Sequence, residues 1–415
     1  MKKLKYLVIL LICIPTFVSA LEYPKTNSKI VEIYDMTDNK VLYEIDSRSK
    51  VSIASLTKIA TTITAIENIE NLDEKVTITG EILSTVRWDA SRAGLYEGET
   101  ITYKDLLYAS MLPSGADATN ALAILSSGSI EKFVDKMNNL AKKIGLDNTH
   151  FINVTGLDIE GHYSSAENMR KLLSYALEND MFKEIYTTRK YTLSDGLKVE
   201  STINTYNRNS NIDTSKIKGS KTGFTEDAGY CLSTLSTING HDFIIIVLNA
   251  EHRNNIYYNI YDTVNLIDFI GNNYKEENLL KKDELLKTIP VSLSDINNYQ
   301  IYSTSEINKY LPSDYNKDDF VIEYDGLDEL SYKNKKGETI GKIKYYYKDE
   351  LLLEENVILN ADINLDISKY LKAHIITITI SLLSIIILII LLLTINKKRH
   401  LNKMSHWFIS FYYKK

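Results

Sequence analysis

An uninterrupted apolar run near the C-terminus constrains the fold of this chain more than any other feature. Residues 373–395 form a stretch of 23 residues that contains no Asp, Glu, Lys or Arg. As a helix this stretch would measure about 34 Å, enough to cross the hydrocarbon core of a bilayer. Three basic residues, 397–399, follow closely, and such flanks stay in the cytoplasm. The sequence therefore predicts a transmembrane helix at 373–395, a cytoplasmic tail at 396–415 and an extracytoplasmic chain before them.

The N-terminus also indicates export. Three lysines among the first five residues precede a short apolar run at 7–14, and small residues at 19–20 suit cleavage. This order is typical of a secretory signal peptide, which we expect at 1–20. A membrane anchor is the alternative, although the apolar run is short for a span. With Cys13 removed, Cys231 would be the last cysteine, so we expect no internal disulfide.

Length and composition define the class of protein. The 415 residues are 44% hydrophobic and 25% charged, which is ample for a large folded domain and a smaller one. The net charge of -6 and the pI near 5.8 do not indicate the basic surface that is typical of a nucleic-acid-binding protein. We therefore predict an enzyme or binding protein of the cell surface, with no nucleic-acid partner.

Hydrophobic patterning predicts both helices and strands between residues 21 and 275. The β-rich runs Ile30 to Tyr34 and Val41 to Ile45 indicate a hairpin. Helical periodicity follows Ser55 and recurs at 103–112, 118–125, 133–144 and 169–179; strand-like runs return at 230–236 and 243–247. Residues 285–362 contain only short strand-like runs, so we expect a small β-rich domain there, serving as a stalk or a partner-binding module.

Ser55 and Lys58 are the first candidate catalytic residues. They lie three positions apart at the start of a predicted helix, which makes them neighbours on one turn. A serine hydroxyl becomes a nucleophile when an adjacent neutral amine takes its proton. The alternative is a capping serine beside a solvated lysine, and the Ser-x-x-Lys pattern alone does not decide between the two.

Two further stretches carry polar groups suited to the same chemistry. Ser114 follows a helix-breaking proline and could relay a proton, while Asp117 could cap the next helix. Lys221, Thr222 and Gly223 begin a strand-like run, where a cation, a hydroxyl and a close backbone approach suit an anionic substrate. An ordinary loop and an ordinary turn are the alternatives.

Histidine residues raise the question of a metal site. His150 and His162 lie in polar loops without a carboxylate or cysteine at ligand spacing. We predict structural roles for both histidines, and neither a metal nor another cofactor.

Taken in order, Ser55-x-x-Lys58, Ser114-Gly115 and Lys221-Thr222-Gly223 resemble the signature of penicillin-binding proteins and serine β-lactamases. The chain is most similar to the low-molecular-weight penicillin-binding proteins that act as D-alanyl-D-alanine carboxypeptidases. The likeness extends from about Ile30 to Phe269 and includes Gly156-Leu157-Asp158. It implies an α+β fold in which a central antiparallel sheet packs between helical regions, with a catalytic domain at 21–275.

The resemblance also implies roles for individual residues. Ser55 would be the acylated nucleophile, Lys58 its general base and Ser114 a proton relay. Substrate binding would fall to a second set: Lys221, Thr222, Gly223, Phe224 and, on a looser alignment, Arg253. The backbone N–H groups of Ser55 and Phe224 would form the oxyanion hole, and the charge of Lys221 would help to keep Lys58 neutral.

The resemblance further implies an activity. The expected enzyme is a membrane-anchored serine carboxypeptidase that removes the terminal D-alanine of peptidoglycan stem peptides outside the cell and is acylated by β-lactams. One departure matters, because Ala116 stands where the family usually has asparagine. It leaves open a catalytically weak penicillin- or muropeptide-binding protein. A β-lactamase is the other alternative, although the second domain and the anchor argue against it.

Overall fold

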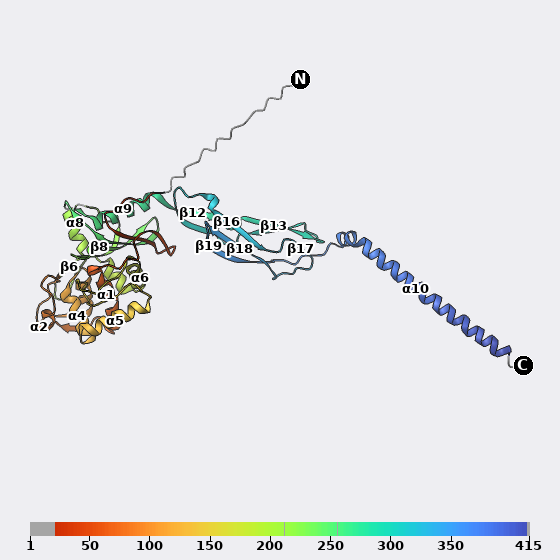
Figure 1. The fold of residues 1–415 in the computed structure, drawn as a ribbon, viewed down its shortest axis with the longest axis horizontal. Coiled ribbons are helices and arrows are strands. Elements are labelled where there is room, and N and C mark those ends of the chain that lie inside the picture. Colours follow the sequence, from red (N-terminus) through yellow and green to blue (C-terminus); the bar gives the residue numbers. More distant parts are fainter. Residues whose placement is uncertain (1–20, 211, 255, 413–415) are drawn as a thin grey trace, which may run out of the picture. The chain divides into compact units, whose positions relative to one another are not determined.

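The computed structural model describes residues 21–210, 212–254 and 256–412, so the predicted signal peptide at 1–20 lies outside the described residues. The described chain divides into two compact units (Figure 1). The first unit runs to Glu277 and also contains Lys309–Tyr315; the second comprises Asn278–Asn308 and the chain from Asn316 onward.

The first unit is built on an antiparallel sheet that, among the described residues, has five strands in the order β2-β1-β9-β8-β7. The strands are β1 (Ile30–Asp35), β2 (Lys40–Ile45), β7 (Ile217–Thr225), β8 (Gly229–Ile238) and β9 (His241–Ala250). The predicted hairpin of β1 and β2 is confirmed to within one residue at its turn. β7 lies at the edge of the sheet.

Both faces of this sheet are buried, which explains the continuous apolar run in β9. Ile244 and Ile246 join a core beneath the helices, whereas Phe243 and Ile245 join a second core on the opposite face. Alternate residues of a strand point to opposite faces, so a strand covered on both sides must be apolar throughout. Helix α9 (Tyr258–Asn273) supplies the second face with Ile260, Leu266 and Ile270.

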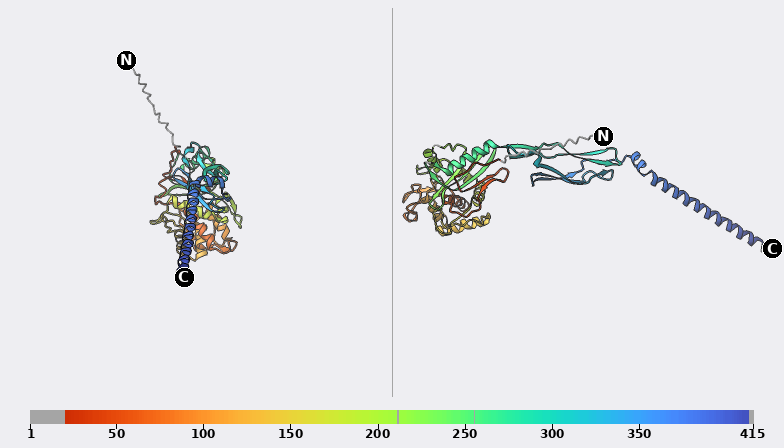
Figure 2. Two further views of the ribbon diagram at one scale, coloured as in Figure 1. Left: turned by 90° about the vertical axis from the view of Figure 1, so that its right-hand side faces the viewer. Right: turned by 45° about the horizontal axis from the view of Figure 1, so that its top comes forward.

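Most of the remaining helices of the first unit gather on the other face of the sheet (Figures 1 and 2). Five of the predicted helical stretches are found: η1 (Ala54–Leu56) with α1 (Thr57–Asn68), α3 (Tyr103–Met111), α4 (Ala116–Ser127), α5 (Ile130–Lys143) and α6 (Ala166–Leu177). The structure adds α2 (Gly80–Ser84), α7 (Asp180–Thr187) and α8 (Thr202–Ser210). The exception in placement is α8, whose Ile203 joins the second core with α9. Short two-stranded ladders also occur: β3 (Lys75–Thr77) with β4 (Thr100–Thr102), β5 (Lys190–Thr192) with β6 (Lys198–Glu200), and β10 (His252–Arg253) with β11 (Ile256–Tyr257).

The second unit contains β-strands followed by one long helix. Its strands form two three-stranded sheets, β14-β13-β17 and β16-β18-β19, in the part of the chain that the structure describes. Their bounds are β13 (Leu285–Ser292), β14 (Asn298–Tyr302), β16 (Phe320–Gly326), β17 (Leu330–Ser331), β18 (Thr339–Tyr347) and β19 (Glu350–Ile358). β12 (Tyr274–Leu280) pairs with β15 (Ile307–Pro312), and η2 (Lys317–Asp319) precedes β16.

The C-terminal helix α10 (Ile367–Tyr412) is longer than the predicted span at 373–395. Its segment Ile367–Ser405 is long and apolar enough to cross a membrane, and its most apolar window is not buried in the structure. Helical structure also continues through most of the basic segment after residue 395.

One local prediction is wrong. Asp117 does not cap the helix of residues 118–125, because α4 already begins at Ala116 with Gly115 as its N-cap. From the first turn of α4, the buried carboxylate of Asp117 accepts hydrogen bonds from the backbone N–H of Ala118 (3.0 Å) and from those of Ala93 (2.8 Å), Gly94 (3.0 Å) and Leu95 (3.2 Å). The three distant amides attach the polar loop after α2 to the start of α4.

Candidate active site

Ser55 lies in a short turn of 3-10 helix that leads directly into α1. The preceding Ala54 has a positive φ of 47°, which is uncommon for a residue with a side chain. Thr57 Oγ1 donates to the carbonyl of Ala54 (2.9 Å), and His162 Nε2 lies 2.8 Å from Thr57 Oγ1. The neighbouring Gly156 has a φ of +84°, and a Cβ atom there would lie 1.8 Å from Ala54 O. The turn that carries Ser55 is therefore held from two sides.

His162 supports this turn as a neutral side chain. Its Nδ1 accepts from the backbone N–H of Ile152 (3.1 Å), so its Nε2 carries the proton that is donated to Thr57. Burial lowers the pKa of His162 to about 4. These contacts agree with the structural role predicted for this histidine.

Lys58 is buried at the base of the site and contacts Ser55. The two atoms Lys58 Nζ and Ser55 Oγ are 3.1 Å apart, and Nζ also donates to the carbonyl of Thr155 (2.8 Å). Burial lowers the pKa of Lys58 to about 7, against the opposing effect of the Asp117 carboxylate. At neutral pH a large fraction of this amine is unprotonated and able to accept a proton.

Ser114 and Lys221 form a second hydroxyl–amine pair. Lys221 Nζ lies 2.9 Å from Ser114 Oγ and donates to the carbonyl of Thr222 (2.8 Å). Ser114 has a φ of 63°, and both side chains are buried. Burial, together with the nearby charge of Lys58, lowers the pKa of Lys221 well below its usual value. Lys221 was expected to help to keep Lys58 neutral. The lowered pKa of Lys58 is instead due to burial, and the repulsion between the two amines acts on the pKa of Lys221.

Strand β7 passes directly beside the Ser55 turn. A Cβ atom on Gly223 would lie 3.1 Å from the backbone nitrogen of Ser55, so glycine permits this close approach. The hydroxyl of Thr222 is hydrogen-bonded to that of Thr202 at the start of α8. Phe224 is 44% exposed, and its ring packs on Tyr230 with the centroids 4.4 Å apart.

Ala116 borders a cavity next to these residues. Its backbone N–H donates to Ser91 O (2.7 Å), and its buried side chain faces a cavity of about 210 Å³ that Asn120 and Thr155 also line. Asn120 lies one turn further along α4 and donates to Thr85 Oγ1 (2.9 Å). The space beside Ala116 is therefore partly polar and open.

Arg253 lies in a different setting. It is an exposed residue of β10, and its guanidinium group lies 5.7 Å from the ring centroid of Tyr258. The contact described for Arg253 is therefore with the ring of Tyr258, which belongs to neither the Ser55–Lys58 pair nor the Ser114–Lys221 pair.

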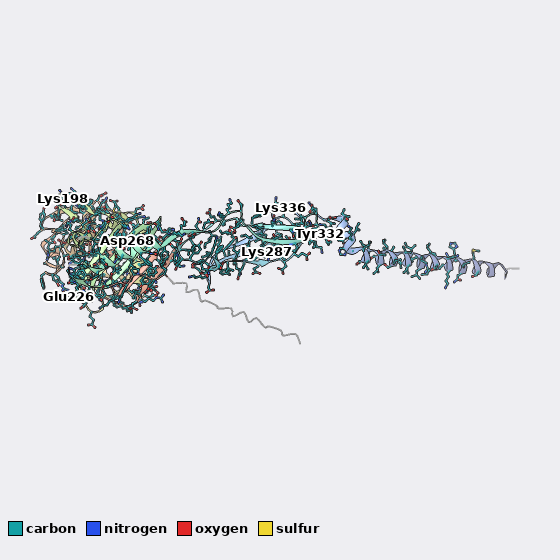
Figure 3. The ribbon with its side chains drawn as sticks, turned by 90° about the horizontal axis from the view of Figure 1, so that it is seen from above. Lys198, Glu226, Asp268, Lys287, Tyr332 and Lys336 are labelled. Atoms are coloured by element: carbon teal, nitrogen blue, oxygen red, sulfur yellow. The ribbon has the colours of Figure 1, made fainter. Side chains whose placement is uncertain are left out.

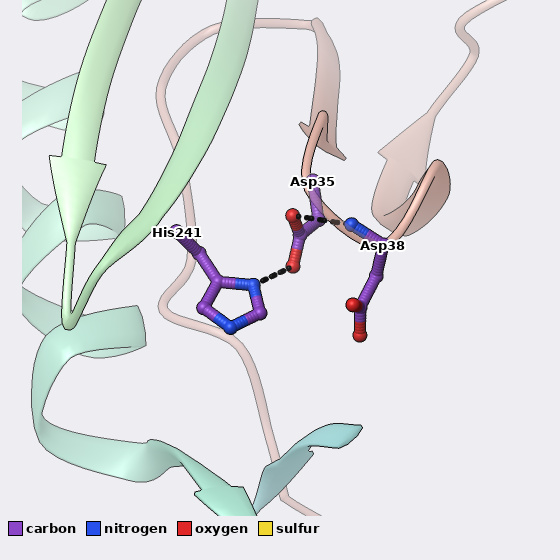
Figure 4. A group of neighbouring side chains, drawn as sticks. All are labelled: Asp35, Asp38 and His241. Carbon is purple, nitrogen blue, oxygen red and sulfur yellow. Dashed lines mark hydrogen bonds and ion pairs between the residues drawn. The ribbon is translucent and has the colours of Figure 1, made fainter. Parts of the chain in front are cut away.

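One group of described side chains has the spacing of metal ligands. Ligand atoms of Asp35, Asp38 and His241 lie within 4.8 Å of one another (Figure 4). One carboxylate oxygen of Asp35 accepts from the backbone N–H groups of Thr37 (2.8 Å) and Asp38 (3.1 Å), and the other lies 3.0 Å from His241 Nδ1. The ring of His241 also stacks on Tyr310 at 4.4 Å. These contacts connect the β1–β2 turn to the start of β9, which explains why the three side chains lie close together.

Several groups at the site were missed by the sequence reasoning. The carbonyl of Thr155 contacts Lys58, Thr202 contacts Thr222, and Asp158 accepts from both Ser52 Oγ and Thr225 Oγ1 at 2.8 Å. Every residue has a backbone carbonyl, so the residue type at position 155 gives no indication of the contact with Lys58. For Asp158, the signal was its place beside the glycine of Gly156-Leu157-Asp158.

Comparison with known proteins identifies the family of this chain. A family model described as D-alanyl-D-alanine carboxypeptidase matches residues 18–252, which is more than half of the chain. The chain belongs to this carboxypeptidase family. Membership confirms the predicted resemblance and the predicted class of enzyme, a serine-type peptidase.

Individual relatives agree with the family assignment. The chain is 28% identical over 342 residues to the D-alanyl-D-alanine carboxypeptidase DacF of Bacillus subtilis, covering 81% of this chain and 85% of that protein. It is 37% identical over 221 residues to a D-alanyl-D-alanine carboxypeptidase of a Streptomyces species, covering 50% of this chain and 75% of that protein. The structure of penicillin-binding protein 5 from Haemophilus influenzae superposes with a TM-score of 0.61 at 23% identity, covering 83% of this chain and all of that one. That likeness confirms the predicted fold class.

Proposed function

We propose that this carboxypeptidase removes the terminal D-alanine from peptidoglycan stem peptides that end in D-Ala-D-Ala, through an acyl-enzyme on Ser55. The observation that carries the proposal is the 3.1 Å contact between Ser55 Oγ and the buried amine of Lys58. An amine with a pKa of about 7 accepts the serine proton at physiological pH.

The reaction divides into acylation and deacylation. Ser55 Oγ attacks the carbonyl carbon of the penultimate D-alanine while its proton passes to Lys58 Nζ. The oxyanion is stabilised by the backbone N–H groups of Ser55 and Phe224. The C–N bond then breaks, and the amine of the departing D-alanine receives a proton through Ser114. Water hydrolyses the resulting ester, with Lys58 again accepting a proton, and Ser55 is regenerated.

The substrate carboxylate determines where the positive charge of the site resides. Burial lowers the pKa of both Lys58 and Lys221, and the charge of Lys58 lowers that of Lys221 further, so the site disfavours two charged amines. A carboxylate bound by Lys221 and Thr222 stabilises the charge on Lys221 and leaves Lys58 neutral. Substrate binding thus prepares the general base. Arg253 would have to leave Tyr258 to provide a second cation for this carboxylate.

β-Lactams carry a carboxylate and a reactive amide, and they acylate Ser55 by the same route.

A second candidate function, a catalytically weak penicillin- or muropeptide-binding protein, is favoured by one observation. Ala116 has no side-chain amide with which to orient a substrate beside Lys58.

Release of D-alanine tests the proposal directly. Purified full-length protein is incubated with a D-Ala-D-Ala pentapeptide, and free D-alanine is measured over time. We expect release by the wild type and none by Ser55→Ala or by Lys58→Arg, because a guanidinium group stays protonated. Penicillin binding without D-alanine release would favour the weak binding protein.

We place the catalytic unit outside the cell membrane, anchored by α10 with the residues after 395 in the cytoplasm. The apolar helix and the basic residues after it support this topology. In intact cells, a tag after Lys415 should resist external protease while the catalytic unit is digested. Digestion of the tag in sealed cells would contradict the orientation.

A further inference from the structure

The first turn of α10 is firmly attached to the β-rich unit. Lys369 Nζ donates to the carbonyl of Ser294 (2.6 Å) and to Asn297 Oδ1 (2.9 Å). The backbone N–H of Asp366 donates to Leu293 O (3.0 Å), and its carboxylate caps the helix by accepting from the N–H of Lys369 (3.1 Å). Since apolar helix follows within a turn, the loop 293–297 must lie at the surface of any bilayer that α10 enters.

A second loop, 332–337, lies at the same end of the unit. The ring of Tyr332 meets that of Tyr370 edge-on, with the centroids 6.1 Å apart. The backbone N–H of Lys336 donates to Asp362 Oδ1 (2.9 Å), shortly before α10 begins. Tyr332 is seen beside the base of α10 in Figure 3, and Lys336 lies further back on the β-rich unit. Loop 332–337 would therefore also lie at the surface of a bilayer that α10 enters.

The side chains at this end have the composition of a membrane interface. The lysines that are exposed there are Lys333, Lys335, Lys336 and Lys372. Exposed apolar side chains accompany them: Ile296, Leu365 and Ile367. Tyr332 and Tyr370 are half-buried. Tyrosine and lysine are enriched where protein meets lipid headgroups, because one end of each side chain is apolar and the other is polar.

Four carboxylates at this end are engaged within the protein, whereas Asp328 and Glu329, just before β17, are exposed. Asp366 caps α10, and Asp362 accepts from the N–H of Lys336. Asp295 bonds to Asn364 Nδ2 (3.2 Å), and Glu338 accepts from the N–H of Lys335 (3.1 Å). These four carboxylates accept from amide groups. The side chains of Lys333, Lys335, Lys336 and Lys372 are exposed, and the ammonium group of Lys335 also donates to the carbonyl of Tyr332 (3.4 Å).

We propose that this face, formed by loops 293–297 and 332–337 with the first turn of α10, binds the headgroups of anionic phospholipids in the outer leaflet. The proposal rests on the membrane anchoring proposed above and adds a specific lipid class. Anchoring by an apolar helix needs no lysines, whereas the exposed lysines attract lipid phosphates, and salt weakens that attraction. Lipid binding here would hold the β-rich unit against the bilayer.

The test uses the full chain in nanodiscs made of either phosphatidylglycerol or phosphatidylcholine. Amide hydrogen exchange is followed in peptides that cover residues 293–297 and 330–338. We expect exchange to be several-fold slower in phosphatidylglycerol than in phosphatidylcholine, and the difference to disappear in high salt. The triple variant Lys333→Gln, Lys335→Gln, Lys336→Gln should lose the difference.

A matched variant controls for total charge. Lys281→Gln, Lys282→Gln, Lys317→Gln removes the same charge from residues that line a separate cavity of the same unit, and it should keep the lipid difference. Equal exchange of the wild type in both lipids, or equal effects of the two triple variants, would overturn the proposal. Failure of the chain to enter nanodiscs would overturn it together with the anchoring. Penicillin labelling of Ser55 in the same samples reports on the peptidase assignment separately.

Discussion

The pH dependence of acylation follows from the environment of Lys58. Burial lowers the pKa of this amine to about 7, and only the neutral amine accepts the serine proton. With that pKa, the neutral fraction rises from about one tenth at pH 6 to about nine tenths at pH 8. The acylation rate constant should therefore rise about tenfold across this interval and then level off.

The assay measures the second-order rate constant for labelling by a fluorescent penicillin in buffers from pH 5.5 to 9. The Asp117 carboxylate opposes the lowering of the pKa of Lys58, so Asp117→Asn should move the midpoint to lower pH. Circular dichroism checks that this variant keeps its fold. A rate that does not change between pH 6 and 8, or near wild-type labelling of folded Lys58→Arg, would refute the role of Lys58 as a neutral base.

Three further substitutions test the surroundings of the site. Ala116→Asn adds an amide beside an open cavity, so acylation by penicillin should become about fivefold faster if one oriented hydrogen bond is gained. Gly156→Ala places a methyl group 1.8 Å from Ala54 O at a positive φ; it should lower the melting temperature and slow acylation together. Burial raises the pKa of Glu99 from 4.5 to about 7, so the stability linked to its proton falls as pH rises between these values. Glu99→Gln should therefore raise the melting temperature more at pH 8 than at pH 5.

Much of the first unit was predictable because its signals are local. Two β-rich runs joined by a polar turn predicted β1 and β2, and the short spacing of Ser55 and Lys58 predicted their contact on one turn. The pairing of Ser114 with Lys221 was different, because 107 positions separate the two residues. Only the resemblance to a family linked these two motifs before the structure did.

Other features depend on contacts that the sequence does not encode locally. Aspartate is a residue type that often caps helices, yet the carboxylate of Asp117 accepts hydrogen bonds from the backbone amides of Ala93 to Leu95 in a distant loop. The partner of Lys58 in the loop of residues 153–158 is a backbone carbonyl, for which residue type gives no signal. The return of Lys309–Tyr315 to the first unit likewise arises from tertiary packing of Tyr310 on His241. Such errors are expected wherever long-range contacts override local preference.

The central claim is that Ser55 is the nucleophile, and the site of a covalent adduct tests it most directly. Full-length protein is treated with penicillin, digested and mapped by mass spectrometry. The account predicts one adduct per chain, on the peptide that contains Ser55, and no adduct on Ser55→Ala. An adduct on another residue, or undiminished labelling of Ser55→Ala, would contradict it.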